Sequence, residues 1–265
     1  MRILKLYPHI DKPERFNYNI NFGIWDAIQG DKVWLEEFKG NLDNYDIVLL
    51  PQCKRWANQK NLINKIKGHK IKAVLFDNDS CYYNFNDERY KGFDYIFYRD
   101  LDKNKKEPNI PSSYLKWSID TDKYHPKYGG SGISFNCSVS SYYPLRMKVK
   151  TVVKNTFYKR KQYISHLQNS AAAIHTDSDI VPAVRGKILE FAACGTQIIS
   201  NRTQRMELYF PDELIVYFND IPHLKQIVNG FKPDIEIQKK LREITVEKHD
   251  DKVRAKEVLS ILSNL

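Results

Sequence analysis

The chain has 265 residues, 42% of them hydrophobic and 13% aromatic, enough for one large folded domain or two smaller ones. Its formal charge of +10 indicates an anionic partner: a nucleotide, a nucleic acid, a phosphorylated polymer or an acidic membrane surface. No apolar run approaches the roughly 20 residues of a membrane span, and the four scattered cysteines form no CxxC pair, which argues against a disulfide framework or a zinc site. The first residues are interrupted too soon for a signal peptide, so we expect a cytoplasmic protein.

In the first half, apolar runs alternate with amphipathic stretches. Strands are predicted at 2–7, 32–38, 45–51, 72–76, 93–100 and 113–120, and helices at 22–29 and 56–68. Strands that alternate with helices through short connections predict a parallel sheet with crossover helices. Gly23 is the only glycine near the first strand, so this half lacks the glycine-rich turn of a phosphate-binding unit.

Two aspartates, Asp77 and Asp79, directly follow the strand at 72–76. Ligands of open parallel sheets bind beyond the carboxyl ends of the strands, so an acceptor pocket is expected here. One of these carboxylates could act as a general base that removes a proton from a hydroxyl, or the two could bind a divalent metal as a D-x-D pair. Of these two roles, we prefer the general base. His9 is a third candidate for the base. The alternative is an Asx-rich turn whose side chains bond their own backbone.

A change of composition near residue 120 divides the chain. The segment 121–132 contains Pro126 and three glycines, which predicts a linker between a first domain, 1–120, and a second domain, 133–245. In the second half, strands are predicted at 133–138, 171–176, 196–200 and 214–219, and helices from 143, at 159–170, at 185–195, at 221–228 and from 234 onwards. The last residues, 246–265, are expected to form a C-terminal helix.

The stretch RGKILEFAACGTQIIS, residues 185–200, predicts a helix, a stop at Gly195 and a buried strand. Arg185, Lys187 and Glu190 gather in the first turns of this helix. The free N–H groups at a helix start, together with two cationic side chains, could bind a diphosphate. Glu190 could accept hydrogen bonds from the two hydroxyls of a ribose. The alternative is that these three residues form the solvated side of an amphipathic helix.

Four segments of the second half resemble, in order, the nucleotide-sugar-binding domain of GT-B glycosyltransferases of the group 1 and spore-maturation types. They are SIDTDKYHPK, ISFNCSVSSYYPLR, RGKILEFAACGTQIIS and ELIVYFNDIPHLKQIV. The resemblance covers about the last 150 residues. It implies an α/β fold with two Rossmann-like domains facing across a cleft and a C-terminal helix that crosses back to the first domain.

The resemblance also implies roles for individual residues. Glu190 would bind the ribose, and Arg185, Lys187 and Arg146 would neutralise the diphosphate that departs as leaving group. Gly195 and Thr196 would lie near the donor. The chain departs from the family at 136–138, where Asn-Cys-Ser replaces a usual glycine, and in the loop HTDSDIVP, where His175, Asp177 or Asp179 would replace a glutamate.

We therefore expect a hexosyltransferase that uses a nucleotide diphospho-sugar, with UDP-sugar the preferred donor, and neither a bound cofactor nor a divalent metal. The expected acceptor is a hydroxyl of a cell-surface glycan or polymer, or of a hydroxymethylated base in DNA, and peripheral membrane contact is a further expectation.

The alternative is a non-catalytic nucleic-acid-binding protein on the same scaffold. Basic residues cluster at 60–72, 102–108 and 146–161, and the last cluster includes Tyr158 and lies near Tyr163, so cations and aromatic rings occur together as in proteins that bind single strands. The other explanation of these clusters is that they are ordinary solvated faces of a lysine-rich protein.

Overall fold

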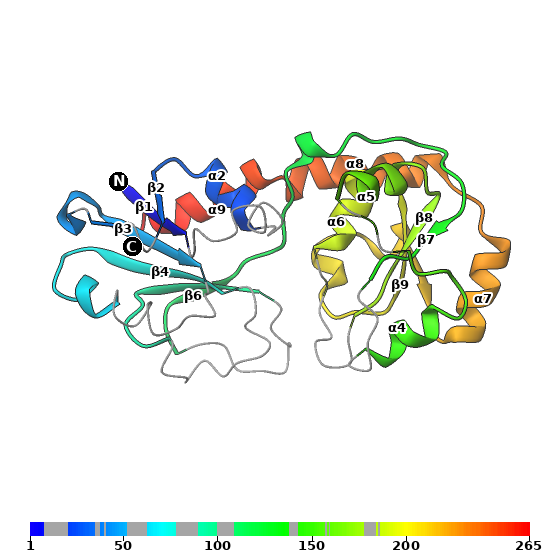
Figure 1. Cartoon of the computed structure of the whole chain (residues 1–265), viewed down its shortest axis with the longest axis horizontal. Coiled ribbons are helices and arrows are strands. Elements are labelled where there is room, and N and C mark those ends of the chain that lie inside the picture. The colour runs from blue at the N-terminus through cyan, green and yellow to red at the C-terminus, as the bar shows by residue number, and fades with distance from the viewer. Residues whose placement is uncertain are drawn as a thin grey trace. The chain divides into compact units, whose positions relative to one another are not determined.

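A computed structural model describes residues 1–7, 21–34, 38–39, 41–51, 63–77, 90–99, 109–137, 143–156, 158, 160–177, 184 and 186–265. The chain divides into two compact units (Figure 1). The first unit contains Met1–Lys116 and Arg254–Leu265, and the second contains Trp117–Val253. His9, Asp79 and Arg185 lie outside the described residues.

The first unit is built on a six-stranded sheet whose strand order is β2-β1-β3-β4-β5-β6, and all its pairs are parallel. The strands are β1 (Ile3–Tyr7), β2 (Asp31–Trp34), β3 (Ile47–Pro51), β4 (Lys72–Asp77), β5 (Tyr95–Tyr98) and β6 (Ser112–Tyr114). All six predicted strands are present, together with α2 (Asn21–Ala27) and the 3-10 turn η1 (Leu42–Asn44). The last predicted strand is shorter than expected, since β6 ends at Tyr114 and the chain passes into the second unit at Trp117.

Both faces of the first sheet are buried, as the continuous apolar runs predict. Alternate strand residues contribute to two cores, with Leu4 and Val48 in one and Ile3 and Ile47 in the other. The second of these cores also contains apolar residues of α9 (Asp251–Leu262), namely Ala255, Val258 and Leu262. The end of the chain therefore completes the first unit, and the predicted C-terminal crossing is confirmed.

The second unit has a four-stranded parallel sheet in the order β10-β9-β8-β7. Its strands are β7 (Ile133–Ser134), β8 (Ala172–His175), β9 (Gln197–Asn201) and β10 (Ile215–Phe218). Its helices are α4 (Pro144–Val149), α5 (Arg160–Gln168), α6 (Lys187–Ala193), α7 (Ile221–Gly230) and α8 (Ile235–His249), with short 3-10 turns η4 (Thr121–Lys123), η5 (Met206–Leu208) and η6 (Asp212–Leu214). Two parallel α/β units confirm the predicted fold class.

The glycine-containing segment 121–132 belongs to the second unit. The amide and hydroxyl of Thr121 both donate to one carboxylate oxygen of Asp250, and the hydroxyl of Ser118 donates to Asp251 over 2.6 Å. Ile119 forms a parallel bridge with Asp250. The residues that enter the second unit are thus bonded to those that leave it, which fixes this segment against the end of α8.

Candidate active site

The carboxyl ends of β7 and β8 lie side by side in the second sheet, because the two strands are parallel neighbours. Asn136 and Cys137 follow β7, and Thr176 and Asp177 follow β8. This edge is where parallel sheets of this kind bind ligands. Side chains from α4 and α6 reach both of these strand ends, and they define the candidate site.

Glu190 lies in the first turn of α6 and is half-buried. One carboxylate oxygen accepts a hydrogen bond from the hydroxyl of Tyr124 at 3.2 Å, and the other accepts one from the hydroxyl of Tyr163 at 3.1 Å. Each oxygen of a carboxylate has two acceptor positions, so these bonds orient the group and leave it able to accept more. A carboxylate held in this way can receive the two hydroxyls of a diol.

The two tyrosines that hold Glu190 are themselves buried. Burial, together with the charge of Glu190, raises the pKa of Tyr163 well above its ordinary value. Tyr163 therefore keeps its proton and remains a donor to Glu190 throughout the physiological pH range. Sequence reasoning missed the role of both tyrosines, because neither lies near Glu190 in the sequence and no spacing pattern connects them.

Lys187 begins α6, and its ammonium group donates a hydrogen bond to the backbone carbonyl of Asn136, just beyond β7. The same ammonium lies 5.7 Å from the ring centroid of Tyr163, within range of a cation–π interaction. The loop after β7, which departs from the family pattern at Asn136, thus anchors one of the predicted phosphate-binding cations. Lys187 and Glu190 share Tyr163 as a neighbour.

Arg146 reaches the neighbouring strand end from α4. Its Nε donates to the hydroxyl of Thr176 over 3.2 Å, and its guanidinium lies 4.1 Å from the ring centroid of Tyr143. Thr176 is buried directly after β8. Arg146 and Lys187 are therefore anchored at the ends of adjacent strands, which places two cations at the edge where the sequence predicts a diphosphate.

The remaining candidates of the second unit make contacts within the fold. His175 ends β8 in a buried position and is hydrogen-bonded through Nδ1 to the hydroxyl of Ser200 at 3.0 Å. Thr196 is buried and donates its hydroxyl to the carbonyl of Leu167 over 2.8 Å. Gly195 has φ +75°, the left-handed conformation predicted for a helix stop. A direct role of these three at a donor stays a prediction.

In the first unit, Asp77 is the candidate base that the structure places. It ends β4 with its side chain fully buried, and it accepts a hydrogen bond from the hydroxyl of Tyr90. The backbone amide of Arg99, at the end of the neighbouring β5, donates to the carbonyl of Asp77 at 3.0 Å. These contacts give Asp77 a packing role, so its role as a base needs a test that separates the two.

Asp77→Asn provides that test, because asparagine can still accept from Tyr90 but cannot take a proton. If Asp77 is buried for packing alone, the variant should retain its melting temperature within a few degrees and should keep the rate of the sugar transfer expected from the sequence within about threefold, well below the effect of a general base. A general base supplies on the order of 10² to 10⁴ in rate, so a fall of that size in a folded variant would establish the catalytic role. Both quantities come from a thermal melt and a transfer assay of the same preparation.

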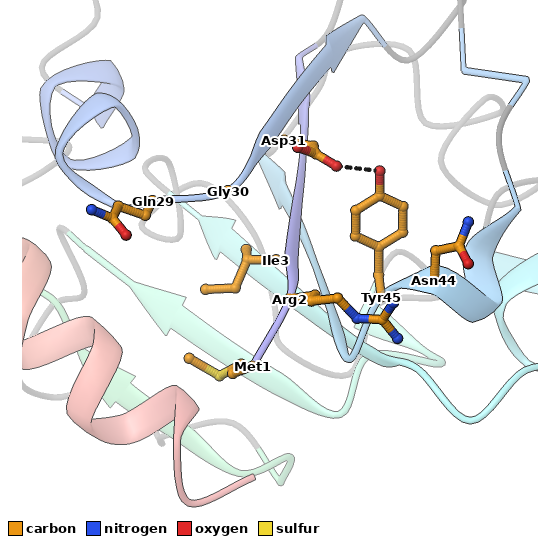
Figure 2. Close-up of a pocket in the computed structure, with 8 residues that line it drawn as sticks. All are labelled: Met1, Arg2, Ile3, Gln29, Gly30, Asp31, Asn44 and Tyr45. Carbon is orange, nitrogen blue, oxygen red and sulfur yellow. Dashed lines mark hydrogen bonds between the residues drawn. The ribbon is translucent and has the colours of Figure 1, made fainter.

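A cavity of about 460 Å³ lies in the first unit, at the start of β1 and β2 (Figure 2). Tyr45 donates its hydroxyl to Asp31 across it over 2.6 Å. The lining residues are Met1, Arg2, Ile3, Gln29, Gly30, Asp31, Asn44 and Tyr45, and none is a predicted site residue. The cavity lies at the amino edge of the sheet, opposite the edge where the candidate base ends β4.

Among the described residues, no three histidine, cysteine or acidic side chains come together as a group suited to a metal ion. In the same part of the chain, no helix is both long and apolar enough to cross a membrane.

The family model described as Glycosyl transferase-like matches residues 123–260, just over half of the chain. No curated protein sequence matches the chain significantly.

Several solved structures share the fold at low sequence identity. Anabaena HepE, solved with UDP and glucose, has a TM-score of 0.66 at 9% identity, with all of both chains covered. The β-glucosyltransferase of T4 phage also has a TM-score of 0.66, at 11% identity and full coverage of both chains. Sucrose-phosphate synthase of Thermosynechococcus elongatus has a TM-score of 0.63 at 8% identity, with 100% of this chain and 98% of that chain covered. The likeness confirms the predicted GT-B fold.

Proposed function

The chain belongs to the glycosyl transferase-like family, and we propose that it transfers a hexose from a UDP-sugar to a hydroxyl acceptor. The observation that carries the proposal is Glu190, held by Tyr124 and Tyr163 at the start of α6. An oriented, half-buried carboxylate at this edge of the sheet is suited to the ribose diol of a nucleotide. A carboxylate kept only as the solvated side of a helix would not need two tyrosine donors.

The cations complete the donor site. Lys187 and Arg146, fixed at the ends of β7 and β8, would neutralise the diphosphate. Breaking the bond between the sugar and the diphosphate leaves negative charge on the departing nucleotide, so fixed positive groups lower the barrier to transfer. Arg185 has the same predicted role. With this charge supplied by side chains, we propose that no divalent metal is required.

The choice of UDP is supported by proteins of the same fold. HepE has been solved with UDP-glucose, and so has the T4 phage enzyme. The acceptor would be bound by the first unit, where Asp77, Asp79 and His9 are the proposed candidates for the base. A cytoplasmic location is supported by Cys137 and Cys194, which are free and buried as expected in a reducing compartment.

A donor screen tests the proposal. Ligand that binds only the native state raises the melting temperature with the logarithm of its concentration over Kd. We expect UDP and UDP-hexoses to raise it, ADP-, GDP- and CMP-sugars to raise it less, and slow UDP-sugar hydrolysis to persist in EDTA. Loss of hydrolysis in EDTA would restore the D-x-D metal hypothesis. If no nucleotide changes the melting temperature, the donor site is wrong and the non-catalytic alternative becomes the better explanation.

A further inference from the structure

The positive charge of this protein is concentrated in one segment. Residues 123–176 contain no aspartate or glutamate but nine lysines and arginines, so they carry nine of the ten net positive charges. The other 211 residues carry only one. This segment forms the first strand–helix–strand part of the second unit, from before β7 to the end of β8. A lysine-rich composition alone would have spread the excess over both units.

Three of these cations extend into water from α4 and the turn after it. Lys148, Lys150 and Lys154 are exposed, and no ion pair involves them within the described residues. Other lysines of the second unit are neutralised, such as Lys239 by Glu236 at 2.8 Å and Lys252 by Asp122 at 2.7 Å. We call Lys148, Lys150 and Lys154 the α4 basic surface.

The α4 basic surface is joined to the candidate donor site by a short, well-bonded connection. Asn155, the residue after Lys154, accepts from the amide of Cys137 and donates to its carbonyl, both over 3.1 Å. Asn155 also pairs with Phe135 in a parallel bridge. Asn136 lies between Phe135 and Cys137 in the chain, and its backbone carbonyl accepts the hydrogen bond of Lys187. A polymer held on the α4 basic surface would therefore lie close to the loop after β7, which anchors Lys187.

The form of this surface favours a polyanion in water over a lipid bilayer. A helix that inserts into a membrane interface keeps an apolar face free. The apolar face of α4 is used inside the unit, where Val149 is buried and Leu145 packs against the core that contains Phe135 and Leu224. The large hydrophobic residue exposed on α4 is Met147, at 47%. What α4 presents to solvent is mainly charge.

Three aromatic rings that the structure describes in this segment, those of Tyr143, Tyr158 and Tyr163, do not offer free faces for base stacking. Tyr143 is covered by the guanidinium of Arg146, and the ring of Tyr158 lies 4.5 Å from that of His166. Tyr163 is buried against Glu190. Recognition of single strands relies on free aromatic faces, whereas recognition of a duplex backbone relies on cations. The chemistry that fits is the regular phosphate array of duplex DNA.

We propose that the α4 basic surface binds the phosphate backbone of double-stranded DNA whose bases carry the acceptor hydroxyl, an inference that rests on the proposed function. The hydroxyl of a hydroxymethylated base in the bound DNA attacks the anomeric carbon of the sugar. Its proton passes to the general base of the reaction, and the bond from the sugar to the nucleotide breaks with its electron pair leaving on UDP. The lysines fix the position of the backbone and take no part in these bond changes.

The salt dependence of binding tests the proposal. Fluorescence anisotropy of a labelled DNA duplex would be measured from low to moderate salt for the wild type and for the triple variant Lys148→Ala, Lys150→Ala, Lys154→Ala. The slope of log K against log salt is negative, and each lost phosphate contact reduces its magnitude by about 0.9, so the slope of the triple variant should be about 2.7 shallower than that of the wild type. For the single variant Lys150→Ala, the slope should be about 0.9 shallower than that of the wild type. The triple variant should also bind the duplex at least tenfold more weakly, which corresponds to about 1.4 kcal/mol of binding free energy.

A matched control separates this surface from total charge. Lys232→Ala, Lys240→Ala, Lys256→Ala removes three exposed lysines elsewhere and should change DNA affinity less than about threefold. An equal loss in both triple variants would overturn the proposal, because net charge alone would then explain binding. The proposal would also be overturned if the wild-type protein did not bind the duplex but bound vesicles containing phosphatidylglycerol. The UDP-induced rise in melting temperature should be unchanged in both triple variants; its absence from the wild type would count against the donor site instead.

Discussion

Glu190→Ala will abolish the rise in melting temperature that UDP gives the wild-type protein and will lower kcat/KM for transfer at least about a hundredfold. A hydrogen bond to a charged group is worth about 1.5–3 kcal/mol, and two such bonds to a ribose diol are lost together. The readout is the difference between melts with and without UDP, because the variant also deprives Tyr124 and Tyr163 of their shared acceptor and its ligand-free melting temperature will fall.

Two controls make this result specific. Glu213→Ala removes an exposed carboxylate of the same unit, and it should keep the full UDP response. Tyr163→Phe keeps the carboxylate but removes one of its two donors, so KM for the donor should rise by about tenfold while kcat changes much less. An unaltered response of Glu190→Ala to UDP would show that the nucleotide binds elsewhere, and the proposed donor site would have to be abandoned.

Gly195→Ala will lower the free energy of unfolding of the second unit by about 3 kcal/mol. Gly195 has φ +75°, which costs a residue with a side chain about 1 kcal/mol. An added Cβ would also lie 2.9 Å from the ring of Tyr128 and 3.3 Å from the carbonyl oxygen of Lys127. Overpacking of this kind typically costs a further 1–3 kcal/mol. Urea denaturation measures the total.

Gly132→Ala is the matched control, because Gly132 has nearly the same φ, +73°, but nothing lies within 4 Å of its added Cβ. It should cost only the backbone strain, about 1 kcal/mol. The difference between the two variants measures the contact of the end of α6 with the segment containing Tyr128. Equal costs would show that the left-handed conformation, and not this contact, makes glycine necessary at position 195.

The local elements of this fold were predictable from the sequence. The strands β3, β8 and β9 are buried on both faces. Because such strands are composed almost entirely of apolar and β-branched residues, they can be recognised in the sequence as continuous apolar runs. Glycine at 195 predicted the end of α6 because few other residues tolerate its φ. Alternation of strands and helices then predicted two parallel sheets. The strand order within each sheet was not predicted, because it depends on contacts between distant segments.

Sequence patterns alone predicted the two α/β units, the start of α6 as a region of interest, and an excess of positive charge. Which side chains meet at the start of α6 depends on how the chain folds in three dimensions. Tyr124 is 66 positions from Glu190, Tyr163 is 27 positions from it, and Lys187 reaches a carbonyl 51 positions away. The same holds for Asp77, which is fully buried and accepts a hydrogen bond from Tyr90. Backbone preferences act over a few neighbouring residues and leave a local pattern, whereas a side-chain partnership between strand ends exists only after the sheet has brought them together.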